Sequence, residues 1–148
     1  MHRPNMLTAA LAGIGGRFAA TAAPRRAQAA PDKAKVVYHL SDLDKVSFAL
    51  GNIRNHFDGM GGPDKVAIAL VVHGPALKEF GDASANPDLA HRVGEFGEAG
   101  LELNACGNTM KAQKITLKDL LPGFIVAERG GVVRIAELQS MGYAYLRP

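Results

Sequence analysis

Hydrophobic runs and polar breaks follow one another along the chain in a regular order. Four short apolar runs rich in β-branched residues are typical of strands buried between helices; they span residues 36–40, 66–72, 101–106 and 124–127. Residues 143–146 fit an additional edge strand. The intervening segments have helical spacing, so the pattern predicts an α/β fold with three layers, in which a mostly parallel sheet of about five strands has helices on both faces.

The clearest helical pattern follows the first strand. Its apolar positions recur at spacings of 3, 4, 3 and 4, namely Leu43, Val46, Leu50, Ile53 and Phe57. Capping residues mark where helices are expected to begin: Ser41 with Asp44, Asn86 before Pro87, Asn108 and Thr109, and Thr116 with Asp119. Gly142 is expected to stop the last helix, and residues 31–35 are expected to form a linker.

The basic residues are unevenly distributed. The chain has 17 Lys and Arg against 14 Asp and Glu, a formal charge of +3. Four arginines and no acidic residue lie in the first 29 positions, which leaves 13 basic and 14 acidic residues, a net charge of −1, for the rest. A nearly neutral domain without a basic stripe is a poor ligand for a phosphate backbone, so no nucleic-acid partner is expected.

Residues 1–29 have the features of an export signal, which leaves residues 30–148 as the domain. A basic start precedes the apolar residues 6–14, and Ala27-Gln28-Ala29 matches a small-x-small cleavage pattern. This predicts a periplasmic or exported protein. The alternative is an Ala-rich extension of a cytoplasmic protein. The apolar stretch is shorter than the about 20 residues that cross a bilayer, so no membrane association is expected after signal removal.

Cys106 is the only cysteine of the chain, which excludes an intrachain disulfide and a multi-cysteine zinc site. It ends the third predicted strand, and His39 and His73 lie at the ends of the first two. Because the carboxyl ends of parallel strands meet at one edge, these three side chains are expected to form a site there. Amides of the following helix favour a thiolate, and Gly107 allows a tight turn. A buried, inert cysteine and an intermolecular disulfide are the other interpretations.

Five segments between residues 35 and 148 carry a family resemblance: Val36–Asp42, Ala49–His56, Val71–Pro75, Leu103–Met110 and Gly142–Pro148. Together they resemble the DsrE/DsrF-like family of sulfur-relay and intracellular sulfur-oxidation proteins. The resemblance implies a compact α/β fold that assembles into homotrimers or homohexamers. It also implies that Cys106 carries sulfur as a persulfide.

The leading hypothesis is therefore a sulfur-binding or sulfur-transfer protein whose partners are a sulfur donor and an acceptor thiol. Its catalytic candidates are Cys106, His73 and His39, and its substrate-binding candidates are Gly74, Gly107, Asn108 and Thr109. No cofactor and no metal are expected, and whether the protein turns over as a sulfurtransferase stays open. The alternative is a non-enzymatic oligomeric module that binds a small ligand and has a structural cysteine. A nucleotide-binding domain is disfavoured by the missing phosphate loop.

Overall fold

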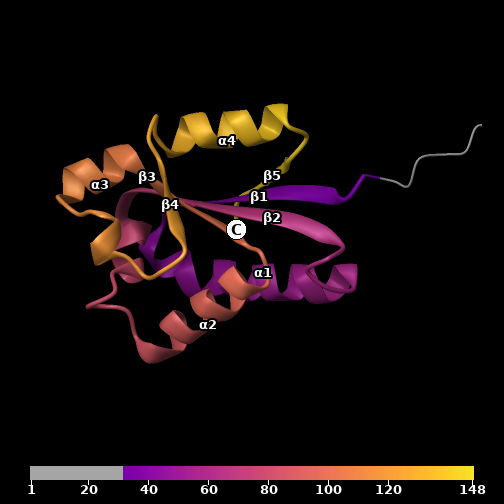
Figure 1. The fold of residues 1–148 in the computed structure, drawn as a ribbon, viewed down its shortest axis with the longest axis horizontal. Helices are drawn as coiled ribbons and strands as arrows, with labels where there is room; N and C mark the ends of the chain where they lie inside the picture. Colours follow the sequence, from indigo (N-terminus) through magenta and orange to yellow (C-terminus); the bar gives the residue numbers. More distant parts are fainter. Residues whose placement is uncertain (1–31) are drawn as a thin grey trace, which may run out of the picture. The chain divides into compact units, whose positions relative to one another are not determined.

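A parallel sheet of five strands forms the centre of the protein (Figure 1). We describe it from a computed structural model, which covers residues 32–148, so the predicted export signal lies outside the described residues. The strands are β1 (Ala34–Leu40), β2 (Val66–Val72), β3 (Glu102–Cys106), β4 (Phe124–Ala127) and β5 (Ala144–Leu146). Their order in the sheet is β4-β3-β2-β1-β5, and each neighbouring pair is parallel. The predicted fold class is confirmed.

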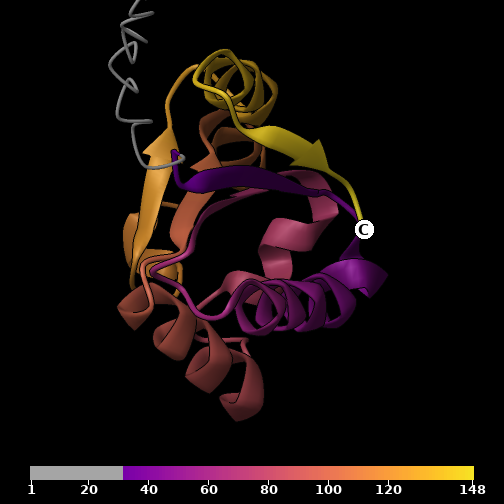
Figure 2. The ribbon, with the colours of Figure 1, turned by 90° about the vertical axis from the view of Figure 1, so that its right-hand side faces the viewer.

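Helices cover both faces of this sheet. The helical elements are η1 (Leu43–Lys45), α1 (Val46–Met60), η2 (Gly74–Phe80), α2 (Pro87–Glu98), α3 (Gly107–Gln113), η3 (Leu117–Asp119) and α4 (Gly131–Ser140). Figures 1 and 2 show α1 and α2 on one side of the sheet and α4 on the other. None of the helices within residues 32–148 is long and apolar enough to span a membrane.

The two faces of the sheet are packed very differently. The face toward α1 and α2 holds the larger apolar core, which includes Leu50, Leu70 and Leu103. The face toward α4 holds a small cluster: Val37, Ala69, Val71, Ile135 and Leu138. This cluster lies over β1 and β2 and does not extend to β3. Side chains alternate along a strand, so the α4 face of β3 presents Glu102, Asn104 and Cys106 instead.

Two predicted boundaries at the start of the domain were wrong. Ala34 and Lys35 belong to β1 rather than to a linker, because they pair with Val66 and Ala67 of β2. Ser41 does not cap α1, because a 3-10 turn lies between them and the N-cap of this turn is Asp42. The Ser41 carbonyl instead accepts a hydrogen bond from the Ala76 amide, which fixes it to the loop after β2. Leu43, predicted to belong to the apolar stripe, is consequently 44% exposed.

The other capping predictions divide into confirmed and wrong ones. Asn86 Oδ1 accepts from the Leu89 amide at 2.8 Å, and Thr116 and Asp119 form a capping box. Gly142 has a φ of +90°, as expected for a left-handed helix stop. Asn108 and Thr109 are not caps, however, because α3 begins immediately at the end of β3 and both residues lie in its first turn.

Gly107 is required by close packing at the junction of β3 and α3. A Cβ placed there would lie 2.9 Å from the Ala127 carbonyl oxygen, which is backbone and cannot rotate away. We therefore expect Gly107→Ala to lower the free energy of unfolding by about 1–3 kcal/mol, measured by urea denaturation.

Gly94→Ala is the matched control for that substitution. Gly94 lies within α2 and its Cβ would meet nothing within 4 Å. Alanine there should stabilise the protein by roughly 0.5–1 kcal/mol, because it restricts the unfolded chain and favours the helix. Equal stability of the two variants would contradict the packing role of Gly107.

Candidate functional site

The carboxyl edge of the sheet brings the predicted cysteine and histidines onto one face. Ala105 is in register with Val72, so the next residues, Cys106 and His73, are neighbours across β3 and β2. His39 lies on β1 in register with Val71. All three alternate with residues of the larger core, and they therefore project from the α4 side of the sheet. The sequence-based expectation that they share one sheet edge matches this arrangement.

Backbone and side-chain donors surround the Cys106 sulfur. The Gly131 amide at the start of α4 donates to Sγ at 3.1 Å. Burial raises the pKa of the thiol, but hydrogen bonds from the Thr109 hydroxyl and from the Thr109, Gly131 and Asn108 amides together lower the pKa below its usual value. The donors come from the first turns of both α3 and α4. This arrangement favours a thiolate, the reactive form of cysteine.

Two consecutive glycines allow α4 to reach the sulfur. Gly130 has a φ of +101°, which disfavours other residues, and a Cβ there would lie 2.6 Å from the Asn108 amide nitrogen Nδ2. A Cβ on Gly131 would lie 3.3 Å from the Cys106 Cβ and 3.4 Å from the His73 Cβ. Gly131 could not be recognised as a donor from the local sequence, because it lies 25 positions after Cys106.

A cavity of about 380 Å³ opens onto Cys106. Its lining residues are His73, Cys106, Asn108, Thr109, Ala112, Arg129, Gly130, Gly131, Val132 and Val133. The cysteine itself is only 5% exposed, so a reagent must enter this cavity to reach the sulfur. Arg129 is the charged side chain on the cavity wall, and small apolar groups make up much of the rest. Such a cavity suits a small, polarisable anion.

His39 and His73 form a stacked pair beside this cavity. Their ring centroids are 4.6 Å apart and a hydrogen bond joins their Nε2 atoms. Burial lowers the pKa of both imidazoles, and for His39 the neighbouring His73 lowers the pKa further. Arg147 also lowers the pKa of both rings, whereas Asp42 raises it. Both rings therefore favour the neutral form more than an exposed histidine does. A neutral imidazole can accept a proton.

Tyr145 completes the histidine pair from β5. Its hydroxyl is 2.6 Å from His39 Nδ1, at the exposed end of the hydrogen-bonded chain Tyr145–His39–His73. Tyr145 was not a predicted site residue, because the pattern of residues 143–146 indicates only an edge strand. The parallel pairing of β5 with β1 is what brings the phenol to His39.

The four predicted substrate-binding residues separate into two groups. Asn108 and Thr109 line the Cys106 cavity. Gly74 and Gly107 do not: Gly107 is buried in the β3–α3 junction, and the Gly74 amide donates to Thr109 Oγ1 at 2.9 Å. Gly74 thus holds the Thr109 hydroxyl in place from the loop after β2. Among residues 32–148, no cluster of three or more His, Cys, Asp or Glu could hold a metal ion.

Comparison with known proteins gives one family and two similar folds. The model of the DsrE/DsrF-like family matches residues 21–148. The structure of the protein of unknown function MTH1491 from Methanobacterium thermoautotrophicum is 29% identical, with a TM-score of 0.68, over 78% of this chain and 99% of that one. The ychN protein from E. coli has the same coverage, 11% identity and a TM-score of 0.54, and shows the fold alone. No curated protein matches the chain.

The Thr109 hydroxyl provides a direct test of the thiolate environment. Thr109→Val keeps the shape and removes the hydrogen bond to the sulfur, so the pKa of Cys106 should rise. We expect alkylation of Cys106 by iodoacetamide near pH 7 to slow by about tenfold. Mass spectrometry across a pH series measures the rate of alkylation. Thr109→Ser keeps the hydroxyl and should react like the wild type. An unchanged pH profile in the valine variant would show that Thr109 does not stabilise the thiolate.

Proposed function

The chain belongs to the DsrE/DsrF-like family, and from this premise we propose that it binds sulfur as a persulfide on Cys106 and passes it to an acceptor thiol. Membership suggests a general role in sulfur relay. The finer assignment is supported by one observation above all, the set of hydrogen-bond donors that converge on the single cysteine. The donors that stabilise the Cys106 thiolate also make it a better leaving group when the sulfur passes to the acceptor.

The proposed reaction consists of two displacements at sulfur. In the first, the Cys106 thiolate attacks the outer sulfur of a donor persulfide, the donor S–S bond breaks, and the donor leaves as a thiolate. In the second, an acceptor thiolate attacks the outer sulfur on Cys106, and the Cys106 thiolate leaves. Each step forms one bond to sulfur and breaks one S–S bond, so no external oxidant or reductant is consumed.

The acceptor must be another molecule. Cys106 is the only cysteine in the 148 residues, so the chain has no second thiol to attack the persulfide and release a disulfide. The outer sulfur would occupy the cavity beside Asn108, Thr109 and Arg129. There the guanidinium of Arg129 favours its negative charge.

The histidine pair is assigned to proton movement. Neutral His73 accepts the proton of an incoming thiol or persulfide and returns it to the departing thiolate. His39 shares that proton through the Nε2 hydrogen bond, and Tyr145 holds the His39 ring in orientation. In this proposal His73 is the group that acts next to the reacting sulfur, since it lines the cavity and His39 does not.

The assembly and the cellular location complete the proposal. We assign the protein to the periplasm or another exported location on the basis of residues 1–29, and to a homotrimer or homohexamer on the basis of the family. One observation favours the second candidate function, a non-enzymatic binding module. Cys106 is as buried as the apolar side chains of the core, which is typical of a packing role.

Sulfur loading distinguishes the two candidate functions. Purified protein incubated with inorganic polysulfide should gain the mass of one or more sulfur atoms, because the thiolate attacks sulfane sulfur. The gain should disappear after treatment with dithiothreitol and should be absent in Cys106→Ser. A wild-type protein that gains no sulfur, or a serine variant that gains as much, would reject sulfur transfer. Cys106 that reacts only after unfolding would favour the binding module.

Removal of the His73 imidazole should slow transfer more than loading. With His73→Gln, we expect release of sulfur from preloaded Cys106 to a small thiol to fall by about 100-fold, because proton transfer by a placed side chain typically contributes at least this much. Mass spectrometry of the loaded protein, quenched at successive times, gives the rate of sulfur release. His91→Gln, on the exposed face of α2, is the control and should leave the rate unchanged. Equal rates in both variants would remove His73 from the mechanism.

A further inference from the structure

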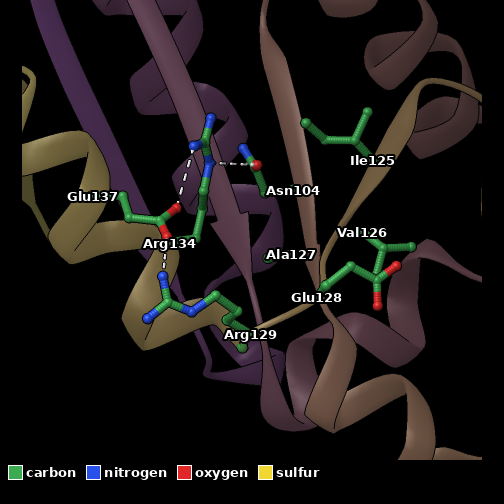
Figure 3. A pocket seen from close by; sticks show the side chains of 9 residues that line it. Asn104, Ile125, Val126, Ala127, Glu128, Arg129, Arg134 and Glu137 are labelled. Atoms are coloured by element: carbon green, nitrogen blue, oxygen red, sulfur yellow. Dashed lines mark hydrogen bonds and ion pairs between the residues drawn. The ribbon is translucent and has the colours of Figure 1, made fainter.

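Arg134 connects the first turn of α4 to β3 through hydrogen bonds to two side chains. Its Nε donates to Asn104 Oδ1 at 3.1 Å, and its Nη2 donates to Glu102 Oε1 at 2.6 Å. Glu137, one turn later on α4, lies 3.5 Å from Nη1 of Arg134 and also pairs with Arg129 at 3.1 Å. Figure 3 shows Arg134 with Asn104, Glu137 and Arg129 along a cavity of about 330 Å³ beside β4. The arginine therefore has a partner for each of its nitrogens.

The partners of Arg134 belong to the same row of side chains as Cys106. Glu102, Asn104 and Cys106 are alternate residues of β3 and face α4 together. Asn104 is 1% exposed, and its amide nitrogen donates to Glu102 Oε1 at 3.0 Å, so the amide and the carboxylate form one prearranged acceptor for the guanidinium. Arg134 and its Glu102 partner are themselves about three-quarters and two-thirds buried, since their side chains are 23% and 34% exposed. Partial burial makes such a pair stronger than a surface ion pair.

These contacts are the polar half of the attachment of α4 to the sheet. The apolar half, Ile135 and Leu138, packs on Val37, Ala69 and Val71, which belong to β1 and β2. Neither contact lies on β3, so apolar packing alone leaves the helix free to tilt away from that strand. Along β3, α4 is attached through Gly131 to Cys106 and through Arg134 to Asn104 and Glu102.

We infer that Arg134 is a positioning residue for Cys106: by binding Asn104 and Glu102, it holds the Gly131 amide against the sulfur. Arg134 lies three positions after Gly131, less than one helical turn, so the arginine fixes the end of the helix that carries the donor. The inference rests on the proposed function for its purpose, because it matters only if the Cys106 thiolate reacts. Its geometry is independent of that function.

The test measures the reactivity of Cys106 without any sulfur donor. In Arg134→Met, the rate of alkylation by iodoacetamide near pH 7 should fall by roughly threefold to tenfold, because the thiolate loses much of one charge-assisted hydrogen bond. The midpoint of the rate-against-pH curve should move upward while the plateau at high pH stays the same. Other titratable or cationic groups at the cavity are His73 and Arg129, and both are retained in this variant.

Two further variants make the outcome specific. Arg134→Lys keeps the charge but cannot present the two-pronged fork to Asn104 and Glu102, so an intermediate shift of the midpoint is expected, and this variant decides the result if Arg134→Met does not fold. Arg54→Met removes an equally close ion pair, Arg54 to Glu95 at 2.7 Å, which joins α1 and α2 on the opposite face of the sheet. It should leave the pH curve of Cys106 unchanged.

The pattern of results separates this inference from sulfur transfer. A general loosening of the structure would expose Cys106 and raise the plateau rate, whereas a lost amide contact moves the midpoint. Folded Arg134 variants with the wild-type midpoint would overturn the positioning role and leave polysulfide loading of the wild type unaffected. A shifted midpoint in a protein that never takes up sulfur would support the positioning role and reject the proposed function.

Discussion

The hydrogen bond from the Gly131 amide to Cys106 Sγ determines how the end of β3 meets the start of α4. A helix amide can approach a strand side chain this closely only where no Cβ intervenes, and glycine at positions 130 and 131 meets that condition. The rest of the α4 face of β3 is polar, and there Glu102 and Asn104 bind Arg134 of α4 and provide the attachment.

Burial of Cys106 affects both the pKa of its thiol and the access of other molecules to the sulfur. Removal from water disfavours the thiolate, and the nearby hydroxyl and amide donors more than offset that effect. The same burial restricts access, because only 5% of the residue is exposed and the reagent must pass through one cavity. Access to the sulfur is therefore limited to reagents that fit this cavity.

Local sequence patterns predicted the helices and strands well, but they could not predict contacts between residues far apart in the sequence. Apolar runs and helical spacing identified the five strands, and strand ends correctly brought Cys106, His73 and His39 to one edge. The order of the strands cannot be obtained from periodicity, yet it is this order that places Tyr145 beside His39. The donor at Gly131 and the Arg134 attachment were missed for the same reason. Ser41 failed as a cap because a 3-10 turn, whose N-cap is Asp42, comes before α1.

The charge state of the histidines indicates how the thiolate is stabilised. Burial lowers the pKa of His39 and His73, which disfavours an imidazolium as the partner of the sulfur. Stabilisation comes instead from fixed dipoles, the amides of α3 and α4 and the Thr109 hydroxyl. In the proposed transfer, fixed dipoles would keep their orientation when a second sulfur is added and the negative charge moves outward, and they do not require a proton to be gained or lost. Neutral histidines then remain available as proton acceptors, a role that an ion pair with the thiolate would have taken from them.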